Sequence, residues 1–299
     1  MVGDFLLCGF VDLSLFARAN KAIKQPYRFE GSRLDGKNFL ATALIICIIL
    51  LPTFFVSAVN ALPFQSGATK GGIMITNQAT GTISFSGYIW NVEDSGSSTW
   101  NPGPNHWSSS ANNVWVDSNG WLHLQITRVK GIWYCVNLET VQVLGFGTYS
   151  FVISNNVASL DDRVVVGLFA YKDDSHEVDI EFSRWGISQA NYAWYTVQPP
   201  PYTLGYNEAS FAAKLTGSYS THFFTWSPNS VFFESLQGQP SITNPPPSSV
   251  IYSFTSPVSS DTTGVMANIN LWLFNGQPPS NGRTVSVVVK SFSFTPASP

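Results

Sequence analysis

The chain has 299 residues, of which 11% are charged, and its formal net charge is −3 at neutral pH. No basic stripe is visible, so nucleic-acid binding has little support. Of the three cysteines, only Cys135 lies outside the N-terminal region, and one thiol forms neither an intrachain disulfide nor a zinc site. Aromatic residues reach 14%, which hints at a carbohydrate groove because sugar rings stack on aromatic side chains, although aromatic-rich sheet packing explains the same composition.

The first predicted element is the uncharged hydrophobic segment 39–58, which is long enough to cross a bilayer as a helix. Lys37 precedes it, and no charge follows before Lys70. This asymmetry predicts a cytoplasmic N-terminus and an external remainder. Small residues at 56–58 and 59–61 fit a cleavage site, so a signal peptide and an uncleaved anchor both stay open.

These features divide the chain into three predicted parts. Residues 1–37 form a leader that we expect to be cytoplasmic or poorly ordered. Residues 38–61 form the signal peptide or membrane anchor, and residues 62–299 form one domain outside the cell. We therefore expect the protein to be secreted, or to be held at the membrane through its hydrophobic segment if that segment is uncleaved.

Beyond residue 62, short alternating apolar runs are separated by Gly, Pro, Asn, Ser and Asp. This spacing is typical of an all-β sandwich or barrel, and no helical period interrupts it. The predicted strands include residues 121–127, 148–154, 163–171, 222–226, 230–236, 267–274 and 284–294. No internal repeat or linker divides the region, so we expect a single β domain.

The stretch "HEVDIEFSRWG" begins at His176 and alternates acidic with apolar residues. In a strand, Glu177, Asp179 and Glu181 share one face, while Val178 and the other intervening residues point to the core. Neighbouring carboxylates repel, so a purely structural strand gains nothing from this pattern.

Paired carboxylates are what a glycosidase needs, because one protonates the leaving oxygen while the other attacks the anomeric carbon or activates water. Glu177 and Glu181 are about 13 Å apart at their Cα atoms in a regular strand, so their side chains must converge to act on one bond. A solvated acidic face is the remaining structural interpretation.

Several segments in the same order resemble glycoside hydrolase family 16, which includes lichenases and laminarinases. "EVDIEF" matches the E-x-D-x-E form of the family signature. Flanking matches are "NNVWVDSNGWLHLQIT" (112–127), "GFGTYSFVI" (145–153), "HFFTWSPNSVFF" (222–233) and "NINLWLFNG" (268–276). The resemblance spans about residues 83–295 and therefore covers the predicted β region.

The resemblance implies a concanavalin-like β-jelly roll of two curved antiparallel sheets, with substrate bound on the concave face. It also implies retention of anomeric configuration. By position, Glu177 corresponds to the nucleophile, Glu181 to the general acid/base, and Asp179 to the helper between them. A structural calcium ion is found in many relatives, but no local motif in this chain identifies its ligands, and we expect no required cofactor.

Further residues are candidates for substrate contact. Trp185 follows the motif closely and is a candidate sugar platform, and Trp107 lies in a Pro/Gly loop where ligand contact and loop packing are equally plausible. The remaining candidates by family position are Trp194, Tyr195, Asn270, Trp272, Asn137 and Glu139. The last two replace a Glu and an Arg of lichenases, which favours a different polysaccharide.

The sequence therefore predicts a monomeric, retaining, endo-acting glycoside hydrolase that cleaves a polysaccharide such as a β-glucan. A non-catalytic carbohydrate-binding module keeps the aromatic groove without needing the acidic triplet. A transglycosylase uses the same covalent intermediate and differs only in the acceptor.

Overall fold

The computed structural model describes residues 81–212 and 214–298. The predicted leader, the hydrophobic segment 39–58 and the first part of the predicted β domain lie outside these residues. Within the described part of the chain, no helix is long and apolar enough to cross a membrane.

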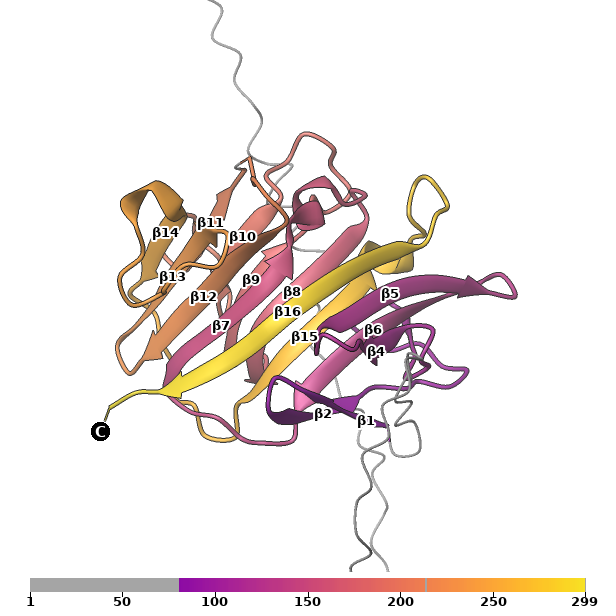
Figure 1. The fold of residues 1–299 in the computed structure, drawn as a ribbon, viewed down its shortest axis with the longest axis horizontal. Coiled ribbons are helices and arrows are strands. Elements are labelled where there is room, and N and C mark those ends of the chain that lie inside the picture. Colours follow the sequence, from indigo (N-terminus) through magenta and orange to yellow (C-terminus); the bar gives the residue numbers. More distant parts are fainter. Residues whose placement is uncertain (1–80, 213, 299) are drawn as a thin grey trace, which may run out of the picture. The chain divides into compact units, whose positions relative to one another are not determined.

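The described residues form sixteen strands in two layers, with three short 3₁₀ turns in the connections between them (Figure 1). The sheet that contains the acidic strand comprises, in spatial order, β11 (Glu208–Phe211), β10 (Ala193–Val197), β9 (His176–Phe182), β8 (Val164–Asp173), β15 (Met266–Leu273), β6 (Ile132–Thr140), β2 (Tyr88–Val92) and β1 (Thr82–Phe85). We call this the first sheet. Each neighbouring pair along this order is antiparallel.

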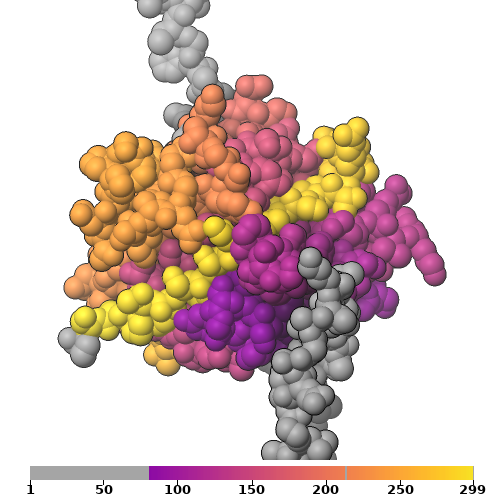
Figure 2. Space-filling model, in the orientation of Figure 1, coloured from indigo at the N-terminus to yellow at the C-terminus, as the bar shows by residue number. Residues whose placement is uncertain are grey.

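The second sheet comprises β14 (Val250–Ser256), β13 (Ser230–Gln237), β12 (Tyr219–Ser227), β7 (Gly147–Ser154), β16 (Val285–Pro296), β5 (Leu122–Val129) and β4 (Val114–Val116). Its outer face is turned toward the viewer in Figure 2, where β16 crosses it as a yellow diagonal. The sheets are continuous through the β5–β6 hairpin, and β3 (His106–Trp107) adds a short parallel pairing to β6. The turns are η1 (Asn155–Ser159), η2 (Pro247–Ser249) and η3 (Phe274–Gly276).

The core lies between the two sheets, because each strand directs alternate apolar residues inward. Phe182 of β9 meets His222 of β12 edge to face, with ring centroids 4.8 Å apart. Tyr195 of β10 stacks on Phe233 of β13, also at 4.8 Å. Cys135 is fully buried within this core. The all-β sandwich predicted from the sequence is confirmed, and it turns the second face of the first sheet away from this core.

Candidate functional site

Strand β9 carries the three predicted carboxylates on one face. Val178 and Ile180 are fully buried on the opposite side, against the core. Glu177 and Glu181 are partly exposed, whereas Asp179 between them is only 4% exposed. The alternation predicted from "HEVDIEF" is therefore confirmed. We call the side of the first sheet that carries these carboxylates the acidic face.

The neighbouring strands fix what surrounds each carboxylate, since residues opposite one another in a ladder project to the same face. Glu181 lies between Trp194 of β10 and Gly167 of β8. Asp179 lies between Thr196 and Phe169 in the same way. Glu177 is opposite Tyr171 and accepts a backbone hydrogen bond at its carbonyl from Gln198 N, 3.0 Å away.

Gly167 allows a neighbouring side chain to pack directly on the backbone beside Glu181. A Cβ atom at this position would lie 2.5 Å from Asn270 Oδ1 and 3.2 Å from a ring carbon of Phe169. Asn270 is opposite Gly167 in the β15–β8 ladder, so its side chain lies across the glycine on the acidic face. Its Oδ1 is buried and has no hydrogen-bond partner within the described protein. Such a group is costly unless another molecule donates to it.

An aromatic cluster borders the Glu181 end of the acidic strand. The ring of Trp185 lies 6.5 Å from Trp194, 6.2 Å from Trp272 and 5.6 Å from Phe274, measured between centroids. Trp194 and Trp272 are 8% and 4% exposed, while Trp185 is half-buried. Trp272 Nε1 is buried without a hydrogen-bond partner in the described residues. Three predicted tryptophans are therefore brought together.

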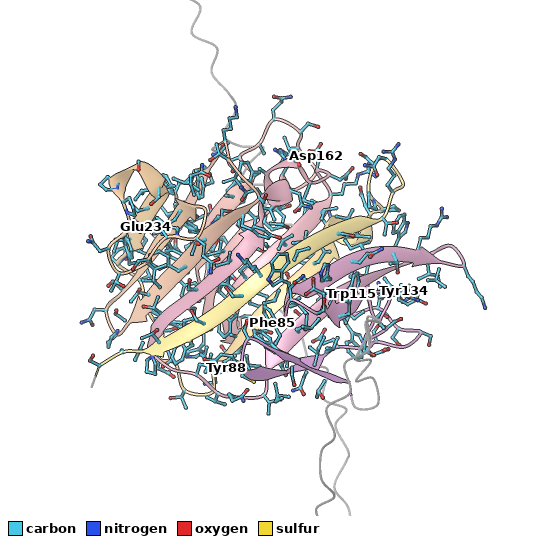
Figure 3. All side chains as sticks on the ribbon, viewed as in Figure 1. Phe85, Tyr88, Trp115, Tyr134, Asp162 and Glu234 are labelled. Carbon is cyan, nitrogen blue, oxygen red and sulfur yellow. The ribbon has the colours of Figure 1, made fainter. Side chains whose placement is uncertain are left out.

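Trp185 is held in an unusual backbone conformation. Its φ is +52°, a left-handed value that is rare for a bulky residue. Trp185 N donates to Ser183 Oγ over 3.0 Å, and Gly186 N donates to the carbonyl of Asp162 over 2.7 Å. Figure 3 labels Asp162 in the loop after η1.

The guanidinium of Arg184 ties the same loop to η1 and to the residue that follows it. Its Nη2 donates to the carbonyl of Ala158 over 2.9 Å, and its Nη1 donates to that of Leu160 over 3.3 Å. Its charge also lies over the ring of Tyr192, 5.6 Å from the centroid. The Trp185 loop is therefore fixed from both sides of the tryptophan.

A second acidic group lies on the same face, toward β2. Glu93 follows β2 and donates its backbone N–H to Asn137 O over 3.0 Å. Burial raises the pKa of the Glu93 carboxyl, a hydrogen bond from Asn137 opposes this, and the charge of Glu139 raises it further. Sequence reasoning named Asn137 and Glu139 but missed Glu93. In an extended chain, residues three apart point to opposite faces, so an apolar Trp90 on the core side places Glu93 on the other side. This pattern is the signal from which Glu93 could have been predicted.

Glu208 is another residue that the sequence did not reveal. It is 7% exposed and lies opposite Thr196 of β10, which is in turn opposite Asp179 of β9. A nearly buried carboxyl group therefore lies two strands from the catalytic candidates, on the same face. Its strand is too short and too mixed in composition to stand out in the sequence.

Two predicted substrate contacts are wrong in their placement. Tyr195 is fully buried on the core side of β10, where its hydroxyl forms a 2.5 Å hydrogen bond with Ser235 Oγ. Adjacent residues of a strand point to opposite faces, so Tyr195 cannot join Trp194 on the acidic face. Trp107 is also fully buried, because β3 pairs with β6 opposite Cys135, and its Nε1 donates to Trp100 O over 3.3 Å.

The described residues contain no cluster of three or more His, Cys, Asp or Glu side chains arranged to hold a metal ion. The calcium ion suggested by the family resemblance therefore has no ligand set that we can name. The acidic face itself offers carboxylates, amides and tryptophans, which can bind and protonate an uncharged, hydroxyl-rich ligand.

Comparison with known proteins bears on the fold. No family model and no curated protein sequence matches the chain. Several solved structures do match the chain. An immunostimulatory antigen and pseudo beta-1,3-glucanase of Mycobacterium tuberculosis matches with a TM-score of 0.52 and 19% identity, over 70% of this chain and 91% of that one. A glycoside hydrolase family protein from Mycobacterium thermorestibile matches with a TM-score of 0.51 and 14% identity, over 69% and 92%.

A Bacillus licheniformis beta-glucanase also matches, with a TM-score of 0.49 and 22% identity, over 77% of this chain and all of that one. The two mycobacterial structures establish a shared fold. The chain has the jelly-roll β-sandwich expected from its sequence. At these identities the likeness extends to the fold alone, so the chemistry has to be argued from the residues of the acidic face.

Proposed function

We propose that the protein is a glycoside hydrolase of family 16 that cleaves a polysaccharide internally, with retention of configuration. The observation that carries this proposal is the acidic triplet of β9. Its three carboxylates share the outward face of a central strand whose other face is core. The sequence signature, the shared fold and the three neighbouring tryptophans support the same assignment.

In the proposed reaction, the carboxylate of Glu177 attacks the anomeric carbon while the carboxylic acid of Glu181 donates its proton to the departing glycosidic oxygen. Glu181, now a carboxylate, then takes a proton from water. The resulting hydroxide displaces Glu177 from the glycosyl–enzyme and restores both groups. Asp179 is nearly buried between them, where its charge disfavours ionisation of a neighbouring carboxyl group and so helps to keep Glu181 protonated.

The spacing of the two glutamates is compatible with this chemistry only if their side chains lean together. Their Cα atoms are about 13 Å apart along a regular strand, whereas retaining enzymes need carboxyl groups about 5–5.5 Å apart. Glutamate is long enough to close much of that gap across Asp179, which is the shorter residue. Gly167 lets Asn270 Oδ1 lie directly over the backbone beside Glu181, where it can contact the sugar whose bond is broken.

The tryptophans supply the binding surface in this proposal. Trp185 and Trp272 present apolar rings at the Glu181 end of the strand, and the unpartnered Nε1 of Trp272 and Oδ1 of Asn270 can bond sugar hydroxyls. We further propose that the enzyme acts outside the cell, because an uncharged segment with a preceding lysine precedes the β domain.

A non-catalytic carbohydrate-binding protein is the second candidate. The observation that favours it is that one structural neighbour is described as a pseudo beta-1,3-glucanase, so the fold can exist without that activity. Such a protein needs the tryptophans but not the acidic triplet. A transglycosylase is distinguished from a hydrolase by product analysis in the presence of an added acceptor sugar.

The test is release of reducing ends from a panel of β-glucans, xyloglucan, agar and carrageenan by the purified full-length protein. We expect Glu177→Gln and Glu181→Gln each to lower turnover by at least about a thousandfold while polysaccharide binding persists. Glu234→Gln, on β13 of the other sheet (Figure 3), serves as the matched control and retains full activity. If both site variants keep wild-type turnover, the proposed mechanism is wrong. Binding without turnover by the wild type favours the second candidate.

A further inference from the structure

The strands of the first sheet carry an unusual distribution of charge. Their acidic-face positions include five carboxylates, and Glu93 directly follows β2 on the same side. These five are Glu139, Glu177, Asp179, Glu181 and Glu208. The only lysine or arginine in these strands, all of which are described, is Lys172, whose side chain lies near Gly264 at the bulged end of β8. The strands of the first sheet therefore carry more carboxylates than lysine or arginine side chains.

Glu93, Asn137 and Glu139 form a group that combines two carboxyl groups with one amide. Asn137 hydrogen-bonds the Glu93 carboxylate. A carboxylate can only accept, so the amide turns its NH₂ group toward Glu93 and its oxygen away. Asn137 Oδ1 is then buried and has no hydrogen-bond partner in the described chain. We call these three residues the acceptor group.

Asn270 extends this arrangement toward the acidic strand. It is opposite Asn137 in the β15–β6 ladder, and its own Oδ1 is likewise unpartnered although the side chain is only 4% exposed. That oxygen lies over Gly167, the residue next to Glu181 in the ladder. A row of acceptors therefore runs from the proposed acid/base to Glu93.

A ligand that satisfies these acceptors has to be rich in donors. A sugar hydroxyl supplies one hydrogen-bond donor, whereas a protonated amine supplies three. The amine also carries a positive charge that complements the carboxylates of Glu93 and Glu139. An isolated pair of carboxylates is costly to desolvate, and a cation between them offsets that cost. A carboxylated or sulfated sugar has the opposite chemistry and is repelled by the same surface.

We propose that the acceptor group binds a 2-amino-2-deoxy sugar unit of the substrate, so that the preferred polymer is a β-glycan with free amino groups. This inference rests on the proposed function, because it takes the acidic face as the surface along which a glycan lies. β6 is three strands from β9, or about 14 Å. The amino sugar therefore lies beyond the ring whose bond is cleaved.

The test is a binding measurement with two matched ligands, the β-1,4-linked glucosamine tetramer and cellotetraose, which differ only at carbon 2. Full-length Glu181→Gln protein is titrated with each tetramer by calorimetry, at a pH where the amine is protonated. The buffer contains about 0.15 M salt, which screens long-range electrostatic attraction. We expect the amino tetramer to bind about tenfold more tightly, since each hydrogen bond to a charged group contributes about 1.5–3 kcal/mol.

Variants of the acceptor group test whether its carboxylates cause the preference for the amino tetramer. Adding Glu93→Gln or Glu139→Gln should reduce the preference toward unity, whereas adding Glu234→Gln on the second sheet should leave it unchanged. Circular dichroism of each variant checks that it is folded. Equal affinity for the two tetramers, binding of neither, or a preference that survives loss of both Glu93 and Glu139 would overturn the inference.

Turnover is measured separately on the wild type, so that the two proposals can fail independently. Cleavage of a neutral β-glucan together with equal binding of the tetramers rejects the amino-sugar site and keeps the hydrolase. A clear preference for the amino tetramer without any cleavage keeps the site and rejects the hydrolase.

Discussion

Replacing Gly167 with alanine tests whether the close packing of Asn270 over Gly167, beside Glu181, is needed for the proposed site. The new methyl group would lie 2.5 Å from Asn270 Oδ1, whereas ordinary contacts begin near 3.4 Å, so that oxygen must retreat by about 0.9 Å. The backbone at Gly167 is not left-handed, so alanine brings no conformational penalty of its own. The perturbation is therefore chiefly a steric displacement of the Asn270 amide, with a smaller shift of the Phe169 ring.

The expected cost follows from this displacement. Overpacking typically costs about 1–3 kcal/mol, and a domain of this size loses about 2–4 °C in Tm for each kcal/mol. We thus expect Tm to fall by about 2–12 °C. Misplacing a substrate-positioning group by about 1 Å can cost about a hundredfold in rate, so kcat/KM on the best polysaccharide should fall about ten- to hundredfold.

Two controls separate the steric effect from a general loss of stability. At Gly145, which also lacks a left-handed backbone, an added Cβ meets only Thr262 Oγ1 at 3.9 Å, so Gly145→Ala should leave Tm and turnover near wild type. Combining Gly167→Ala with Asn270→Ala removes the clash and should restore Tm without restoring turnover. A Gly167→Ala protein with wild-type Tm and kcat/KM would refute the reasoning.

Three further variants probe other parts of the molecule. Burial and the charge of Glu139 raise the pKa of Glu93 above its ordinary value of 4.5. The folded state therefore binds this proton more tightly than the unfolded state does. The stability that the protonated acid contributes is lost as pH rises from 4.5 through the raised pKa. Glu93→Gln should therefore be more stable than wild type at neutral pH and indistinguishable from it at pH 3, whereas parallel Tm profiles would contradict this. Tyr195→Phe should cost about 1 kcal/mol in urea unfolding, because it loses the bond to Ser235, while kcat/KM stays unchanged. A loss of turnover at unchanged stability would instead return Tyr195 to the binding surface. Trp185→Ala should raise KM about tenfold, since it removes an aromatic surface from the cluster, and an unchanged KM would argue against a sugar platform there.

The sequence predicts the local features of this site well and its long-range features poorly. The period-two pattern of β9 is local, so the shared face of Glu177, Asp179 and Glu181 could be inferred directly. The same rule could have excluded Tyr195, because its neighbour Trp194 already occupies the acidic face. Its inclusion came from family position, which gives a region of the chain but not the direction of each side chain.

The site features that could not be predicted from the sequence depend on pairing between distant strands. Glu93 lies beside Asn137 because β2 pairs with β6, a contact between segments more than forty residues apart that no local pattern reveals. Trp107 was expected in a loop, with ligand contact and loop packing equally plausible, but its segment pairs with β6 and buries the indole. The role of Gly167 likewise depends on the β15–β8 register, which brings Asn270 across it.

The most direct test of the central claim is the anomeric configuration of the first product released from the best β-linked polysaccharide. Proton NMR within the first minutes, before mutarotation, distinguishes the two anomers, and Glu181→Gln protein supplies the blank. Double displacement through Glu177 predicts that the β-anomer forms first and that the blank forms none. Initial release of the α-anomer, or equal product from the Glu181→Gln protein, would contradict the proposed roles of the two glutamates.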